Sequence, residues 1–171
     1  RYNNYVHNTL TFNRKYQYVE GRARIDRSSD REDHMFVVSD LTPVYKDQVK
    51  RVERAVSLVD KKYVVIEDCV ETNEFFTMLT WTMATPASAK VLADDVILLE
   101  KDGKKLYLKV EGVENIRWRI SPAKSDFTFD SPNPGVSIVG FDTDLNLSKR
   151  QKIKVVLMPG KLKEVQYKSL L

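Results

Sequence analysis

Cysteine and histidine are scarce in this sequence of 171 residues, which has one cysteine, Cys69, and two histidines, His7 and His34. One cysteine forms no internal disulfide, and these three residues are too few for a closed zinc site built from histidine and cysteine alone. No stretch approaches the roughly 18 consecutive apolar residues that a membrane-spanning helix needs, and the N-terminus lacks the basic-then-apolar pattern of a signal peptide. We therefore expect no membrane span and no internal disulfide.

The common catalytic signatures are also missing. The sequence has no glycine-rich phosphate loop, no Gly-x-Ser-x-Gly elbow, no His-Glu-x-x-His motif and no Cys-x-x-Cys pair. Cys69 lies in an apolar pattern next to Val70, where a thiol is a small core side chain far more often than a nucleophile. We therefore assign no catalytic residue to this chain and do not expect it to be an enzyme by itself.

Charge of one sign is not in large excess, because 28 Lys and Arg stand against 24 Asp and Glu and give a net charge of +4. The two signs are interleaved along most of the chain, whereas nucleic-acid-binding proteins gather their positive charges on one face or helix. Only Arg22, Arg24 and Arg27 form a basic cluster. The sequence therefore predicts no nucleic-acid partner.

Apolar and polar residues alternate in many segments, and this period of two indicates half-buried strands. The clearest prediction is a hairpin over residues 96–110, in which Asp102 and Gly103 suit the positive φ values of a tight type I′ turn. Further strands are expected over residues 6–12, 35–39, 63–70, 75–83, 115–120, 136–141 and 152–157. Many short strands separated by proline and glycine turns predict an all-β fold, a large antiparallel β-sandwich.

The secondary structure of two segments is harder to predict from the sequence pattern. Val49, Val52, Val56 and Val59 have the spacing of an amphipathic helix, but alternation and the nearness of the next strand favour a strand over residues 49–59. Residues 28–33 (Ser-Ser-Asp-Arg-Glu-Asp) are so polar and charged that we expect a mobile loop.

The length suits one domain with a hydrophobic core, so we expect a single sandwich domain over residues 1–171. The sequence starts at Arg1 rather than with a methionine, which indicates a processed chain or a piece of a longer protein.

Aromatic and basic residues near the N-terminus are the main candidates for ligand contacts. Tyr16 and Tyr18 alternate on one side of a polar stretch close to Arg22 and Arg24. This combination suits an anionic sugar, because aromatic rings pack on sugar rings and guanidinium groups pair with carboxylates or sulfates. Core packing is the alternative for the aromatic residues, and a surface position with no special role is the alternative for His7.

Residues 1–17 resemble a known family. They contain Tyr2, Tyr5, the run His7-Asn8-Thr9 and, after a short turn, Gln17. This order resembles a segment of the heparinase II/III-like polysaccharide lyases. Residues 52–56 (Val-x-Arg-x-Val) and 63–68 (Tyr-Val-Val-Ile-x-Asp) resemble two later strands of that family, and residues 157–159 (Leu-Met-Pro) resemble its closing strand. The resemblance covers nearly the whole chain, although only the His-Asn-Thr segment is distinctive.

The resemblance implies a C-terminal sandwich domain that follows an N-terminal helical toroid in an enzyme that cleaves acidic, uronic-acid polysaccharides by β-elimination. The catalytic residues would lie mainly in the part of the enzyme that precedes Arg1. His7 would be one ligand of a structural zinc, with the other ligands upstream, so we expect no cofactor in this chain alone. The implied partners are the acidic polysaccharide and the toroid, and the implied location is periplasmic or secreted.

The resulting set of candidate substrate-binding residues is Tyr2, Tyr5, Asn8, Tyr16, Tyr18, Arg22 and Arg24. Two other functions fit the sequence. One is a carbohydrate-binding module, in which exposed aromatic residues form a flat platform. The other is a purely structural or adhesive sandwich, which no particular residue favours.

Overall fold

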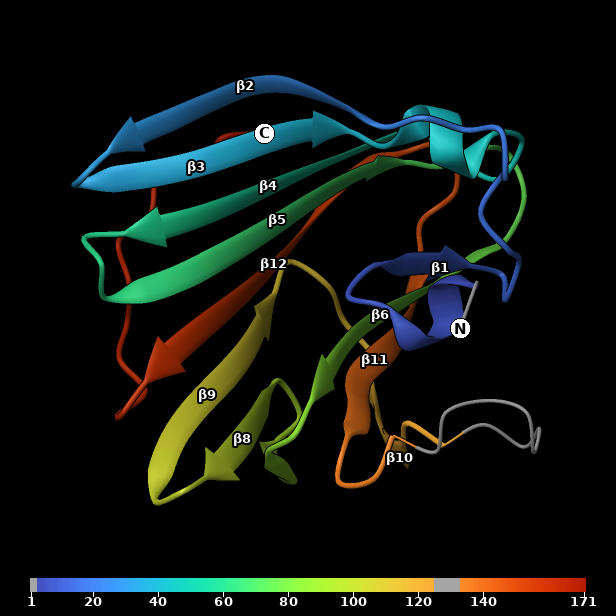
Figure 1. The fold of residues 1–171 in the computed structure, drawn as a ribbon. Helices are drawn as coiled ribbons and strands as arrows, with labels where there is room; N and C mark the ends of the chain where they lie inside the picture. Colours follow the sequence, from blue (N-terminus) through green and yellow to red (C-terminus); the bar gives the residue numbers. More distant parts are fainter. Residues whose placement is uncertain (1–2, 125–132) are drawn as a thin grey trace.

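In residues 3–124 and 133–171, which a computed structural model of the protein describes, twelve β-strands form two antiparallel sheets (Figure 1). The smaller sheet has four strands in the order β1 (Leu10–Phe12), β6 (Thr77–Thr85), β11 (Ser137–Leu145) and β10 (Arg117–Pro122). The larger sheet has eight, in the order β2 (Arg24–Arg31), β3 (His34–Asp40), β4 (Arg51–Val59), β5 (Tyr63–Glu71), β12 (Arg150–Pro159), β9 (Lys104–Glu111), β8 (Val96–Lys101) and β7 (Ser88–Ala93). The predicted all-β sandwich is confirmed.

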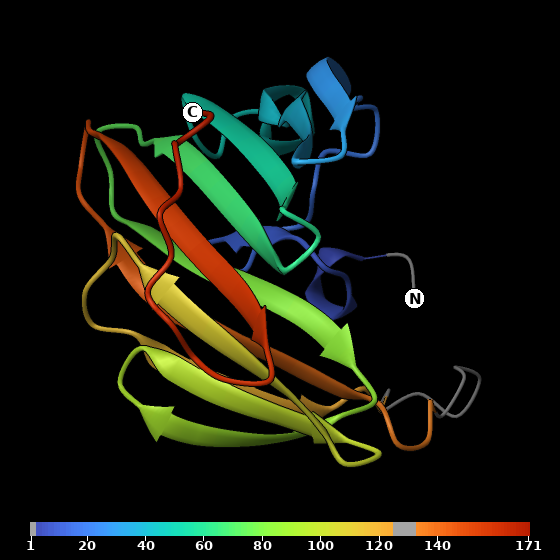
Figure 2. The same ribbon diagram turned by 90° about the vertical axis from the view of Figure 1, so that its left-hand side faces the viewer.

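Two short 3₁₀ helices complete the regular structure, η1 (Asn4–Val6) before β1 and η2 (Thr42–Tyr45) before β4. After β12 the last residues of the chain run back across the eight-stranded sheet on the side away from the smaller sheet (Figure 2). The larger sheet therefore has an inner face, which meets the smaller sheet, and an outer face, which the C-terminal segment crosses.

The main core lies between the two sheets. Trp81 of β6 stacks on Phe141 of β11 with ring centroids 5.9 Å apart, and Phe12 meets Tyr45 edge-on at 4.9 Å. Aliphatic side chains of the larger sheet pack against these rings, and they include Val52, Val70, Leu108, Val110, Ile153 and Val155. A Cβ at Gly140 would lie 1.9 Å from the carbonyl oxygen of Trp81, so only glycine allows β11 to approach β6 this closely.

The hairpin and the valine-rich segment are confirmed as strands. β8 and β9 are joined at Asp102 (φ 50°) and Gly103 (φ 72°), as the type I′ turn requires. Residues 51–59 form β4, in which Val52 is fully buried and the neighbouring Arg51 is exposed. The helical spacing of the valines is therefore coincidental, because the same residues also fit a strand that pairs on both sides.

Two sequence predictions near the N-terminus are wrong. The expected loop over residues 28–33 is largely strand, since Ser28–Arg31 belong to β2 and pair with β3. The expected strand over residues 6–12 begins only at Leu10, because η1 occupies Asn4–Val6. β1 also lacks the alternation expected of it, since Thr11 is buried along with its two apolar neighbours.

Candidate functional site

The buried side chain of Asn4 connects the parts of the N-terminal segment that carries the candidate residues. Its amide nitrogen Nδ2 donates to Thr11 Oγ1 at 2.6 Å and to the carbonyl oxygen of Lys15 at 3.1 Å. Its Oδ1 accepts from the backbone N–H of Gln17 at 3.1 Å. One amide therefore joins η1, β1 and the turn after β1, and it fixes the positions of the tyrosines on either side.

A second polar cluster holds this segment against η2. The Tyr45 hydroxyl donates to the carbonyl oxygen of Leu10 at 2.7 Å and accepts from Gln17 Nε2 at 2.8 Å, with Thr9 Oγ1 at 3.0 Å. Burial raises the pKa of Tyr45 above its usual value. Thr9 of the His-Asn-Thr run and Gln17 after the turn thus lie side by side. Both side chains form hydrogen bonds with the Tyr45 hydroxyl.

A buried ion pair lies next to this cluster, between Arg54 of β4 and Asp68 of β5. Arg54 Nε and Nη2 donate to the two carboxylate oxygens at 2.6 and 2.9 Å, and Nη1 donates to the carbonyl oxygen of Asn8 at 3.1 Å. Although burial disfavours the charged guanidinium, the Asp68 carboxylate keeps the pKa of Arg54 above its usual value. The two residues hold the start of β1 against the larger sheet, which is a positioning role.

Asn8 is fixed on both sides, because its Oδ1 also accepts from the backbone N–H of Ala84 at 2.8 Å. His7 is exposed, and its carbonyl oxygen accepts from Thr82 Oγ1 at 2.7 Å. No group of three or more His, Cys, Asp or Glu side chains in residues 3–124 and 133–171 is arranged to hold a metal ion. Within these residues His7 does not belong to such a group.

The structure brings some of the candidate aromatic and basic residues together and separates others. The rings of Tyr5 and Tyr16 lie 5.1 Å apart, and both side chains are exposed. Tyr18 lies instead under the ammonium group of Lys46, 5.2 Å from the ring centroid. Tyr2 lies outside the described residues.

The two arginines of the candidate set differ in their surroundings. Arg22 is exposed in the segment before β2. Arg24 forms ion pairs with Asp26 at 2.7 Å and with Asp40 at 3.7 Å, and these carboxylates raise its pKa. Arg24 is therefore largely neutralised, which makes Arg22 the more available of the two for an anionic ligand.

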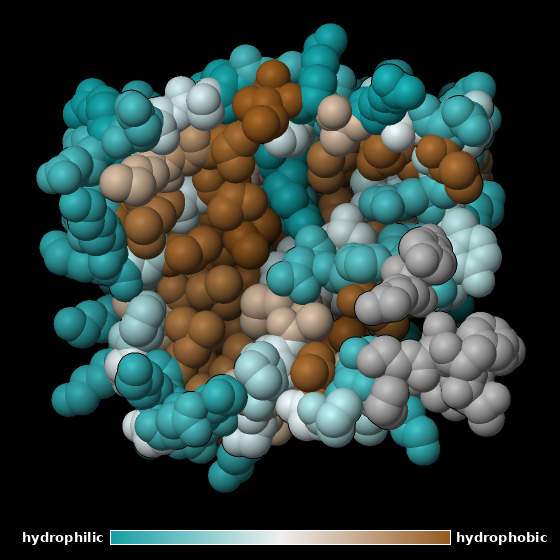
Figure 3. All heavy atoms as spheres, viewed as in Figure 1, coloured by the Kyte–Doolittle hydropathy of each residue, from teal (hydrophilic) through white to brown (hydrophobic). Residues whose placement is uncertain are grey.

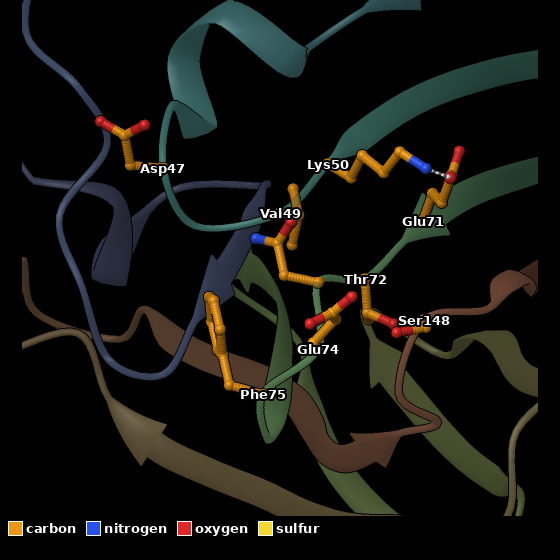
Figure 4. Close-up of a pocket in the computed structure, with 9 residues that line it drawn as sticks. Asp47, Val49, Lys50, Glu71, Thr72, Glu74, Phe75 and Ser148 are labelled. Atoms are coloured by element: carbon orange, nitrogen blue, oxygen red, sulfur yellow. Dashed lines mark ion pairs between the residues drawn. The ribbon is translucent and has the colours of Figure 1, made fainter.

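The sequence did not indicate a pocket of about 700 Å³ at one end of the sandwich (Figure 4). Lys50 pairs with Glu71 across 2.6 Å and lowers the pKa of that carboxyl group, while Asp47 lies on the opposite side of the pocket. Glu74 and Phe75 come from the segment before β6. Three carboxylates against one ammonium group give the pocket a net negative charge, which disfavours an acidic glycan.

Apolar side chains gather over the inner face of the larger sheet, in a broad patch that the smaller sheet leaves open (Figure 3). Cross-strand pairing places Val37 beside Val56 and Ile66, and it places Met35 beside Leu58 and Val64. These side chains are only partly buried, although they continue the row that includes the fully buried Val155. We call Met35, Val37, Val56, Leu58, Val64, Ile66 and Leu157 the open apolar face.

A contiguous apolar patch is unusual on the surface of a protein that works alone and is typical of an interface. The open apolar face contains no charged side chain, although the Arg54–Asp68 pair lies beside it on the same inner face. The outer face of the same strands includes Ser57 and Glu67. No helix in the described part of the chain is long and apolar enough to cross a membrane. Independently of that finding, the apolar character of this face is typical of a surface that contacts another protein.

Comparison with known proteins shows which fold this is. No family model and no curated protein matches the sequence. Among solved structures, the heparan sulfate lyase HepC from Pedobacter heparinus matches 94% of this chain with a TM-score of 0.73 at 14% identity, and 25% of the lyase chain is covered. A heparinase III, the BT4657 gene product, matches 91% of this chain with a TM-score of 0.71 at 19% identity, and 24% of that chain is covered.

The chain thus has the fold of a sandwich domain of the kind found in heparinase III and heparan sulfate lyase structures. The chain spans about a quarter of the length of those lyases. The resemblance noted in the sequence agrees with this fold.

Proposed function

We propose that this chain is the C-terminal sandwich domain of a heparinase-like lyase that cleaves acidic polysaccharides by β-elimination. The observation that carries the proposal is the fold match, which extends over almost the whole chain but over only a quarter of each lyase. The catalytic base and the group that protonates the leaving oxygen then belong to the preceding part of the protein. This domain supports that part and lines the substrate cleft.

The open apolar face is the surface that we assign to the contact with the preceding helical toroid. Its seven residues are uniformly apolar and lie on consecutive strands of one rigid sheet, from Met35 on β3 to Leu157 on β12. Burial of such a face stabilises an assembly by roughly 25 cal/mol for each Å² of apolar surface removed from water. A domain with a matching apolar surface is therefore the expected cover.

Candidate glycan contacts in this proposal are the exposed Tyr5, Tyr16, Tyr18 and Arg22, with the paired Arg24 and the fixed Asn8 as weaker members. His7 contributes one zinc ligand only if the preceding part supplies the others, because a structural zinc needs about four. Polysaccharides are too large to enter a cell intact, so we propose a periplasmic or secreted location.

The test is a lyase assay that follows the ultraviolet absorbance of the unsaturated uronate product. The 171-residue chain and the longer protein that contains it are compared on heparan sulfate and on a neutral glucan. We expect product from heparan sulfate with the longer protein alone. Absence of product with both proteins on a panel of uronic-acid polysaccharides would contradict the proposal.

A second candidate is a carbohydrate-binding module without catalysis, and the exposed pair of Tyr5 and Tyr16 favours it. Their rings are inclined by 31° and therefore do not form one flat platform, which weighs against this function. Glycan binding by the chain together with a catalytically silent longer protein would select the module over the lyase.

A further inference from the structure

A cavity of about 510 Å³ lies on the outward face of the smaller sheet, away from both the core and the open apolar face. Leu79 and Trp81 of β6 point into the core, so the alternating Thr80 and Thr82 face outward and form the floor with Thr11 of β1. Gly140 pairs with Thr82 on one side and with Arg119 on the other. A Cβ at Gly140 would collide with the backbone of β6, so the glycine lets β11 lie close to β6 at this point of the floor.

Three cations surround this floor: Arg14 in the turn after β1, Arg119 on β10, and Lys124. Arg119 donates to Asp142 Oδ2 at 3.0 Å, and Thr80 donates to Asp142 Oδ1 at 2.6 Å. In the part of the chain that the structure describes, Arg14 and Lys124 form no ion pair. Among the described residues that line the cavity or pair with its lining, three positive charges stand against one carboxylate that already has two partners, which is an excess of positive charge.

Tyr5 forms one wall of the cavity and is held in place. Its hydroxyl donates to the carbonyl oxygen of Arg14, and its ring rests against Tyr16. The cavity thus combines an aromatic wall and threonine side chains with two cations, Arg14 and Lys124, that form no ion pair with the described residues, in a volume typical of small-molecule sites. The Thr80 and Thr82 hydroxyls already donate to Asp142 and to the carbonyl oxygen of His7, so the aromatic ring is the group that suits a sugar, while Arg14 and Lys124 suit a carboxylate or sulfate on that sugar.

We propose that this cavity binds one acidic sugar unit of a polysaccharide, with Arg14 and Lys124 at its anionic group and Tyr5 against its ring. The choice of an acidic glycan rests on the proposed function, whereas the site itself rests on the cavity and its charges. The site deepens the proposed function, because it names a place where this chain itself would bind the glycan. This place is on a different side of the molecule from the open apolar face.

The experiment is calorimetric titration of the 171-residue chain with a heparin-derived tetrasaccharide, with maltotetraose as the neutral sugar and sodium sulfate as the free anion. Arg14→Gln and Lys124→Gln are compared with Lys90→Gln, which removes an equal charge from an exposed residue on β7. We expect each of the first two changes to weaken tetrasaccharide binding by about fivefold, while Lys90→Gln changes it by less than about twofold. Circular dichroism checks that each variant is folded.

Equal weakening by all three changes would overturn the site, because it would mean that net charge alone attracts the glycan. Sulfate that binds as tightly as the tetrasaccharide would overturn the recognition of a sugar. The lyase assay is independent of this titration. Tetrasaccharide binding at the cavity with a silent longer protein refutes the lyase alone, and an active longer protein with no binding at the cavity refutes the site alone.

Discussion

Val64 and Val65 are neighbours on β5, yet they face opposite sides of the eight-stranded sheet. Val65 is fully buried on the outer face, where it packs with Val156 and Met158 under the C-terminal segment. Val64 belongs to the open apolar face and is only partly buried. The same strand therefore has one side that the chain covers by itself and another that it leaves uncovered.

The C-terminal segment covers the outer face and forms hydrogen bonds with the polar groups of that face. Tyr167 reaches Ser57 Oγ at 3.0 Å and donates to Glu67 Oε2, also at 3.0 Å, and the N–H of Leu170 donates to the same carboxylate oxygen at 2.8 Å. An extended segment with free backbone groups can cover such a mixed face, because each buried polar group finds a partner. The open apolar face offers no polar partner, so we expect its proposed cover to be made of packed side chains.

The largest effect is expected at the ion pair that anchors the start of β1 to the inner face. Asp68→Ala leaves the nearly buried guanidinium of Arg54 without its carboxylate, and breaking a buried pair in this way costs about 3–5 kcal/mol. Chemical denaturation of the variant measures the free energy of unfolding. As a control, Arg51→Ala removes the more exposed pair with Glu53 and should cost less than about 1 kcal/mol. Equal losses would show that the pair does not anchor the fold.

A matched pair of substitutions compares the two faces directly. Val65→Ala removes buried methyl groups and leaves a cavity, so we expect a loss of about 2 kcal/mol. Val64→Ala removes the same atoms from a partly hydrated position and should cost less than about 1 kcal/mol. Denaturation curves of the two variants decide the comparison, and a larger loss at Val64 would mean that the inner face is covered even in this chain.

The smallest of these effects concerns the outer cover. Tyr167→Phe removes the hydrogen bonds to Ser57 and Glu67 and should cost about 1 kcal/mol near neutral pH. Burial, together with the nearby Glu67 carboxylate, raises the pKa of Tyr167 above its usual value, so the folded protein disfavours the deprotonated phenol. The contribution of Tyr167 is therefore complete below about pH 10 and is lost as the pH rises above it.

Unfolding curves recorded for both proteins between pH 8 and pH 11 test this dependence. The wild-type protein should lose more stability than Tyr167→Phe over that range, and the two curves should converge at the alkaline end. Parallel pH profiles would show that Tyr167 does not contribute in this way.

Local patterns were enough to predict much of the fold. The Asp102-Gly103 sequence correctly predicted the β8–β9 hairpin, because few residue pairs suit a two-residue turn with positive φ values. The same reasoning failed over residues 28–33, where the charges that suggested a loop lie on the edge strand β2. Charged side chains protect an exposed sheet edge from pairing with other chains, and composition alone does not separate this role from disorder.

The candidate sites were less predictable, since they depend on which strands become neighbours. Tyr5 and Tyr16 were both singled out, and the fold places their rings in contact. Arg119 and Lys124 lie more than a hundred residues from Arg14 in the sequence, and no local signal joins them before the smaller sheet forms. The open apolar face was equally invisible, because its residues have the alternation of any half-buried strand.

The most direct test of the account is whether the open apolar face is covered in the longer protein that we propose. Leu58→Cys places a thiol on that face, and the wild-type chain serves as the control because its one cysteine, Cys69, is buried. The rate of maleimide labelling is then compared between the 171-residue chain and the longer protein. We predict rapid labelling of the chain alone and at least about tenfold slower labelling in the longer protein, whereas equal rates would contradict the docking of another domain on this face.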